Sequence, residues 1–205
     1  MIEFFLALLL WLAVFVHSSL IASLTAKRNP QRAGSVMQTS MLVLSMVSIL
    51  FMGGPQRFGL FRGWSFVFQA FLLGFGVSLV LNLVQKDSDV PEFLPEGIER
   101  FIILLILAPV SEELLNRGLI EGYLLGYGHF WSSILFSTLL FALLHWMAYE
   151  GSKRQKIGVV GGAFVLGSLA GYLFVLGGII PAIVLHSSAN LAGLALLRFK
   201  EKNEN

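Results

Sequence analysis

Two glutamates and an arginine interrupt a largely apolar stretch of the sequence. Glu112, Glu113 and Arg117 lie in a run that is mostly hydrophobic from about residue 101 to 127. A charged side chain near the middle of a bilayer costs at least about 2.5 kcal/mol even on lenient insertion scales. Ionisable groups at this depth therefore indicate a functional site, and later parts of the chain should supply its partners.

Helical spacing gives the two glutamates different neighbours. At 100° per residue they do not share a face, but each has a side chain one turn further on. Glu113 can pair with Arg117, whereas Glu112 is followed by the neutral amide of Asn116. We therefore predict an internal ion pair between Glu113 and Arg117, with Glu112 left free to act on another group, for example as a general base. The alternative, that all three only hold helices together, stays open.

Two histidines lie in equally apolar surroundings later in the chain. His145 follows the residues Phe-Ala-Leu-Leu, and His186 is followed one turn later by Asn190 on the same face. Two imidazoles and a buried carboxylate together favour a site. His17 and His129 lack such surroundings, and we interpret them as lying outside it.

Two chemistries fit these residues. Glu112, His145 and His186 satisfy the ligand count of a catalytic zinc site with an open fourth position. Alternatively, Glu112 is the general base, while a histidine or the Asn190 amide stabilises the oxyanion of a tetrahedral intermediate. Both routes lead to hydrolysis. The spacing does not match His-Glu-x-x-His, so no zincin is predicted.

The composition places these residues in a membrane protein. Of 205 residues, 56% are hydrophobic and 13% are charged, and the mean hydropathy is +0.80. We predict an all-α, polytopic transmembrane bundle that forms a single integral-membrane domain over 1–205, with its motif-bearing core at about 98–198. The basic residues lie between apolar runs, so nucleic acid is not an expected partner. The absence of cysteine excludes disulfides and thiolate metal sites.

About seven spans are expected. Pro109 should kink the fourth, because it cannot donate to the carbonyl of Leu105. On these boundaries His145 lies close to the end of its helix, and extending that helix past Met147 would bring it deeper. Gly167 and Gly171 predict a close approach of another helix to the sixth span. The predicted spans are 2–24, 35–52, 63–84, 98–127, 130–148, 157–176 and 181–198, with a polar loop at 86–96.

The loop charges predict the orientation. Eleven Lys and Arg residues lie in the first, third and fifth loops and the C-terminal tail, against two in the second loop. By the positive-inside rule the C-terminus should be cytoplasmic and the N-terminus outside.

Three ordered motifs resemble the CPBP intramembrane protease family, also called the CAAX protease and bacteriocin-processing or Abi family. They are Glu112-Glu113-x-x-x-Arg117, Phe141-x-x-x-His145 and His186-x-x-x-Asn190, which cover about 80 residues and leave out the first three spans. The resemblance implies a helical membrane peptidase in which Glu112 activates water, His145 and His186 lie in the site, and Asn190 polarises the scissile carbonyl.

The family has been described both as metallopeptidases and as metal-independent glutamate peptidases, and the residues leave that choice open. Zinc is the candidate cofactor in the first case, with Glu112, His145 and His186 as ligands, and none is required in the second. The expected substrates are membrane-associated proteins or peptides, prenylated in some members. We therefore predict an intramembrane endopeptidase. It should be a multi-pass protein of a prokaryotic cell membrane, with the lipid bilayer as a further partner. A transporter or partner-binding scaffold is the alternative.

Overall fold

The apolar stretches fold into long helices, because within a bilayer a helix satisfies every backbone polar group internally. The structure, a computed structural model, describes residues 1–84, 97–149 and 151–204. Within these ranges the chain is helical, with a single isolated antiparallel bridge between Phe61 and Gly178. The predicted all-α bundle is confirmed. The predicted loop at 86–96 lies outside the described residues.

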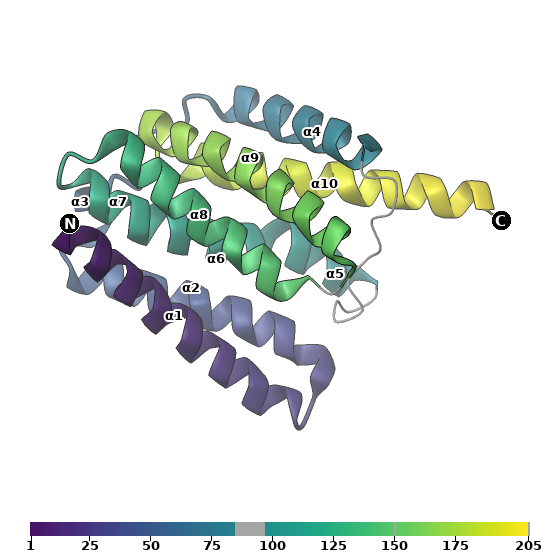
Figure 1. The fold of residues 1–205 in the computed structure, drawn as a ribbon, viewed down its shortest axis with the longest axis horizontal. Helices are drawn as coiled ribbons and strands as arrows, with labels where there is room; N and C mark the ends of the chain where they lie inside the picture. Colours follow the sequence, from purple (N-terminus) through teal and green to yellow (C-terminus); the bar gives the residue numbers. More distant parts are fainter. Residues whose placement is uncertain (85–96, 150, 205) are drawn as a thin grey trace.

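Six long helices form most of the bundle (Figure 1). The α1–α2 hairpin lies on one side, α4 packs along α10 on the other, and α8 and α9 pack against each other between them. Two short helical turns, η1 (Pro30–Arg32) and α3 (Gly54–Arg57), follow α1 and α2. The long helices are α1 (Ile2–Ala26), α2 (Ala33–Phe51), α4 (Val67–Val84), α8 (Phe130–Ala148), α9 (Lys153–Gly177) and α10 (Ile179–Glu204).

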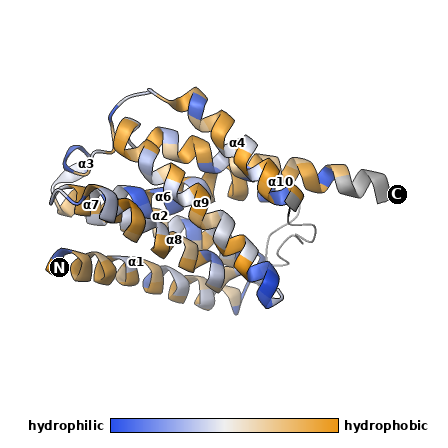
Figure 2. Ribbon diagram, turned by 45° about the horizontal axis from the view of Figure 1, so that its top comes forward, coloured by the Kyte–Doolittle hydropathy of each residue, from blue (hydrophilic) through white to orange (hydrophobic). Residues whose placement is uncertain are grey.

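Every predicted span contains helical structure, but not all are single long helices. Five helices of the described chain are long and apolar enough to cross a membrane, and the apolar part of α4, Val67–Leu83, is shorter. Hydrophobic residues make up most of these helices (Figure 2). The α9 helix begins at Lys153, four residues earlier than predicted, because Ser152 and Gln155 form a capping box.

The motif-bearing fourth span is a broken helix. It consists of α5 (Ile98–Ile102), the π-helical η2 (Ile103–Leu107), α6 (Ala108–Glu113), the π-helical η3 (Leu114–Glu121) and α7 (Gly122–Leu125). The irregularity expected at Pro109 is present, but it takes the form of wide π turns on both sides of α6. All eight residues of η3 are buried. The motif therefore lies in the middle of the bundle.

Pro109 leaves one backbone carbonyl without a backbone donor. That carbonyl belongs to Leu104, one residue before the Leu105 that α-helical spacing predicts. The N–H of Ala108 donates to the carbonyl of Ile103, five residues back. In that register the carbonyl of Leu104 would be paired with residue 109, which as proline has no N–H. The side-chain amide of Asn190 supplies the missing donor, with its Nδ2 2.7 Å from the Leu104 oxygen.

The α4 helix packs closely against α10, the helix that carries His186 and Asn190. A methyl group added at Gly74 would overlap the carbonyl oxygen of Leu185 and the hydroxyl of Ser188. One turn further along α4, Ser78 donates its hydroxyl to the carbonyl of Ala189 at 2.8 Å. Small residues and interhelical hydrogen bonds are the usual means of joining helices within a membrane. Both contacts flank His186.

Candidate active site

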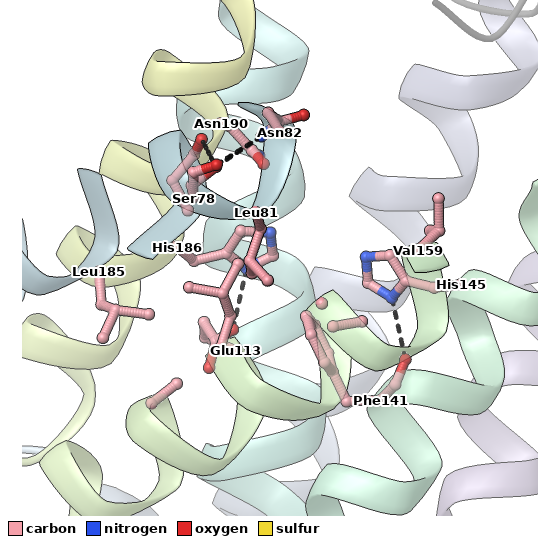
Figure 3. Close-up of a pocket in the computed structure, with 15 residues that line it drawn as sticks. Ser78, Leu81, Asn82, Glu113, Phe141, His145, Val159, Leu185, His186 and Asn190 are labelled. Carbon is pink, nitrogen blue, oxygen red and sulfur yellow. Dashed lines mark hydrogen bonds and ion pairs between the residues drawn. The ribbon is translucent and has the colours of Figure 1, made fainter. Parts of the chain in front are cut away.

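A cavity of about 180 Å³ lies where α4, α8, α9, α10 and the motif helix meet. Most of its wall is apolar, and the polar groups include three of the four residues predicted to be catalytic. Glu113 contributes to the wall and Glu112 does not. The polar side chains that line it are Ser78, Asn82, Glu113, His145, His186 and Asn190 (Figure 3).

His186 lies between the two glutamates of the motif. Its Nδ1 is 2.9 Å from Oε1 of Glu113, and its Nε2 is 4.0 Å from Oε2 of Glu112. An ionised carboxylate can only accept a hydrogen bond, so Nδ1 carries a proton. In the neutral ring, Nε2 is then an acceptor that faces Glu112.

Glu113 has a partner on each carboxylate oxygen. Oε1 accepts from His186 at 2.9 Å, and Oε2 lies 3.3 Å from Nε of Arg117. The predicted ion pair with Arg117 is present, and both side chains are buried. The contact with His186 was not expected, because helical spacing relates residues of one helix and says nothing of a side chain 73 positions later. Glu113 thus orients the imidazole as well as binding the arginine.

Glu112 differs from Glu113 in exposure and in partners. Its side chain is 15% exposed. Oε1 accepts a hydrogen bond from Nε2 of Gln38 at 3.0 Å, and Oε2 faces His186. The neighbour expected for this carboxylate, Asn116, instead donates to the backbone carbonyl of Glu112 at 2.8 Å. A short amide side chain readily folds back onto the carbonyl of the preceding turn.

Arg117 is a buried cation at the centre of several helices. Its Nη2 donates to the carbonyl of Gly167 at 2.8 Å, and its guanidinium lies 4.6 Å from the centre of the Phe141 ring. A Cβ at Gly167 would lie 3.0 Å from Nη2. The close approach predicted at this glycine is therefore made by a charged side chain of the motif helix.

Glu121 is a buried carboxylate that the sequence reasoning missed. It is fully buried, and its Oε2 accepts from the Ser137 hydroxyl at 2.8 Å. It also interacts electrostatically with Arg117. A Cβ at Gly171 would lie 2.8 Å from the same oxygen, which explains the second glycine of the pair. Its position four residues after Arg117 in an apolar run was the signal that could have revealed it.

His145 reaches the cavity from the last turn of α8. Its Nδ1 lies 3.0 Å from the carbonyl oxygen of Phe141, and since a carbonyl only accepts, Nδ1 carries the proton. The α8 helix ends at Ala148, as predicted, and does not continue into the loop that begins at Tyr149. His145 and His186 nevertheless line one cavity, from different helices (Figure 3).

A three-ligand metal set is not assembled by these residues. Among the described residues, no three histidine, aspartate or glutamate side chains are placed to hold one metal ion. Glu112, His145 and His186 are therefore not gathered into a three-ligand set.

The three sequence motifs all lie within a segment that matches a protein-family model. Residues 95–192 match the family model described as Rce1-like, type II CAAX prenyl endopeptidase Rce1-like. Residues 95–192 belong to the CAAX protease family. The resemblance inferred from the motifs is confirmed, and the general activity of this CAAX protease segment is that of an intramembrane endopeptidase. The helices α1, α2 and α4 precede the matched segment. Comparisons with curated proteins and with solved structures gave no match.

Proposed function

We propose that this chain hydrolyses peptide bonds of membrane-associated substrates with a water activated at Glu112. The observation that carries the assignment is the pairing of the four carboxylate oxygens of the motif. Gln38, His186 and Arg117 contact three of them, and the fourth, Oε2 of Glu112, faces Nε2 of His186 at 4.0 Å. This distance is too long for a direct hydrogen bond, but a water about 2.8 Å from each atom fits it.

The chemistry follows from those positions. Glu112 takes one proton from the water while the water oxygen forms a bond to the substrate carbonyl carbon. His186 accepts a hydrogen bond from the water's other O–H and so orients the water. One N–H of Asn190 donates to the carbonyl of Leu104, and its second N–H polarises the substrate carbonyl. As the C–N bond breaks, Glu112 returns its proton to the leaving amine.

One observation favours Glu113 as a second candidate for the base. Glu113 contributes to the cavity wall, and Glu112 does not. Against this assignment, both oxygens of Glu113 are already paired, one with a buried cation. Each oxygen of Glu113 therefore already faces a side-chain donor, whereas Oε2 of Glu112 is left to face a water. Glu112 is therefore preferred.

The substrate class that we propose is a peptide with a prenylated cysteine near its C-terminus. The matched family is described as a CAAX prenyl endopeptidase, and a CAAX tail carries its prenyl group on a cysteine three residues before the end. The apolar cavity wall, with Leu81, Leu166 and Leu185, suits a lipid-modified chain. We also propose a cytoplasmic C-terminus, which the distribution of Lys and Arg among the loops supports, and a prokaryotic cell membrane.

The decisive test is cleavage of a defined peptide by the purified full chain in detergent. We expect a farnesylated CAAX peptide to lose its last three residues, as detected by mass spectrometry, and the same peptide without the farnesyl group to be cleaved more slowly. The His186→Ala variant should be inactive but folded. Absence of peptide hydrolysis, together with a voltage-dependent flux in liposomes, would favour the transporter alternative.

Metal removal gives a separate prediction. Because the side chains considered as zinc ligands are not gathered, we expect dialysis against a chelator to leave the cleavage rate within about twofold of the untreated protein. Elemental analysis of the dialysed sample provides the control that metal has been removed. A loss of activity that added zinc restores would contradict the glutamate-dependent mechanism.

A further inference from the structure

The α2 helix, which lies outside the family match, touches the proposed base. Gln38 is half-buried on α2, and its Nε2 donates to Oε1 of Glu112 at 3.0 Å. The two residues are 74 positions apart. A hydrogen bond from a neutral amide to a carboxylate is charge-assisted and stronger than one between two neutral groups. It can therefore hold the carboxylate in one orientation.

Ser111 fixes which end of the Gln38 amide faces Glu112. The hydroxyl of this fully buried serine donates to Oε1 of Gln38. An ionised carboxylate accepts hydrogen bonds only, so the amide N–H must face Glu112 and the amide oxygen is left for Ser111. The chain of contacts is ordered: Ser111 to Gln38, then Gln38 to Oε1 of Glu112. Oε2 is thereby left directed at His186, 4.0 Å away.

The α1 helix holds the backbone of the same residue. Nε1 of the buried Trp11 donates to Oδ1 of Asn116 at 3.2 Å, and Nδ2 of Asn116 donates to the carbonyl oxygen of Glu112 at 2.8 Å. The hairpin thus positions Glu112 in two ways. The α2 helix contacts its carboxylate directly, and α1 contacts Asn116, which binds its backbone carbonyl.

We propose that the α1–α2 hairpin is a positioning module for the base, in which Gln38 is the positioning residue that aims Oε2 of Glu112 at the water. This proposal rests on the proposed function. A peptidase needs its base aligned with both the water and the scissile carbonyl, and small misplacements of a catalytic group cost up to about 100-fold in rate. Segments beyond the family motif therefore contribute to the rate of this enzyme.

The kinetic test replaces the amide with a side chain of similar length. Gln38→Met should lower kcat by about 10- to 100-fold and leave KM unchanged, because only the alignment of the base is affected. Ser111→Ala should give a smaller loss, and the double variant should be no worse than Gln38→Met, since the two residues act as one unit. Ser48→Ala, which removes a local hydrogen bond on the same helix, is the matched control. Unchanged kcat in Gln38→Met, or additive losses, would overturn the proposal.

A second measurement does not depend on activity. The rate at which a hydrophobic carbodiimide modifies Glu112, followed by peptide mass spectrometry, should rise severalfold in Gln38→Met and stay unchanged in Ser48→Ala. An oxygen that no longer accepts a hydrogen bond is the more reactive nucleophile. If the wild-type chain cleaves no peptide, the proposed function fails, and this rate still tests the Gln38 contact. An equal rate in both variants would overturn the positioning role.

Discussion

Replacing Glu112 with glutamine should lower the cleavage rate by about 10²- to 10⁴-fold, the usual contribution of a general base. The amide can still accept from Gln38 through its oxygen, so the local hydrogen bond survives. It cannot take a proton from water. The thermal midpoint in detergent should therefore change by only a few degrees, and initial rates measured beside a melting curve check both parts.

Glu113→Gln is the matched control for that variant. It removes one charge of the buried pair with Arg117 and the carboxylate that orients His186. We expect activity and thermal stability to fall together. If Glu113→Gln were as stable as the wild type and inactive, while Glu112→Gln kept most of the activity, Glu113 would be the base.

Arg117→Met should be the most destabilising single change in the motif. Arg117 is fully buried and is the cation between two buried carboxylates, Glu113 and Glu121. Removing one partner of a buried ion pair typically costs about 3–5 kcal/mol, because the remaining charge is left uncompensated. The substitution also removes the bond to Gly167. Chemical denaturation in detergent micelles measures the loss.

A double variant distinguishes whether Arg117 stabilises the protein through its charge or through its packing. Arg117→Met combined with Glu113→Gln removes both charges of the pair, so the double variant should be more stable than Arg117→Met alone. If the two losses simply added, the effect of Arg117 would be one of packing against Phe141 and not of charge.

Much of the site was predictable because it depends on local spacing. Glu113 and Arg117 are four residues apart, and their ion pair follows from helical geometry even though η3 is π-helical. Pro109 removes a backbone donor wherever it lies in a helix, so a carbonyl without a partner nearby was expected. The prediction was wrong only about which carbonyl this is. Because of the π turn, the carbonyl of Leu104, and not that of Leu105, lacks a backbone donor.

Contacts between helices distant in the sequence were not predictable. Nothing in the pattern of α2 singles out Gln38 as a partner of Glu112, because Gln38 is one of several polar residues in α2 and helical spacing relates only residues of the same helix. The bond from Glu113 to His186 depends on how α10 packs against α6, which Gly74 and Ser78 on α4 help to determine.

The sequence by itself determined that the chain is a helical membrane protein with a carboxylate-histidine site, because charges in apolar runs are costly and residues four apart on a helix are neighbours. Only the tertiary structure decided that it is Oε2 of Glu112 that faces Nε2 of His186 at 4.0 Å. Glu112 and Glu113 are adjacent and identical in type, and spacing along their own helix distinguishes them only by the residue one turn further on. Other helices place the Gln38 amide against Glu112 and Nδ1 of His186 against Glu113.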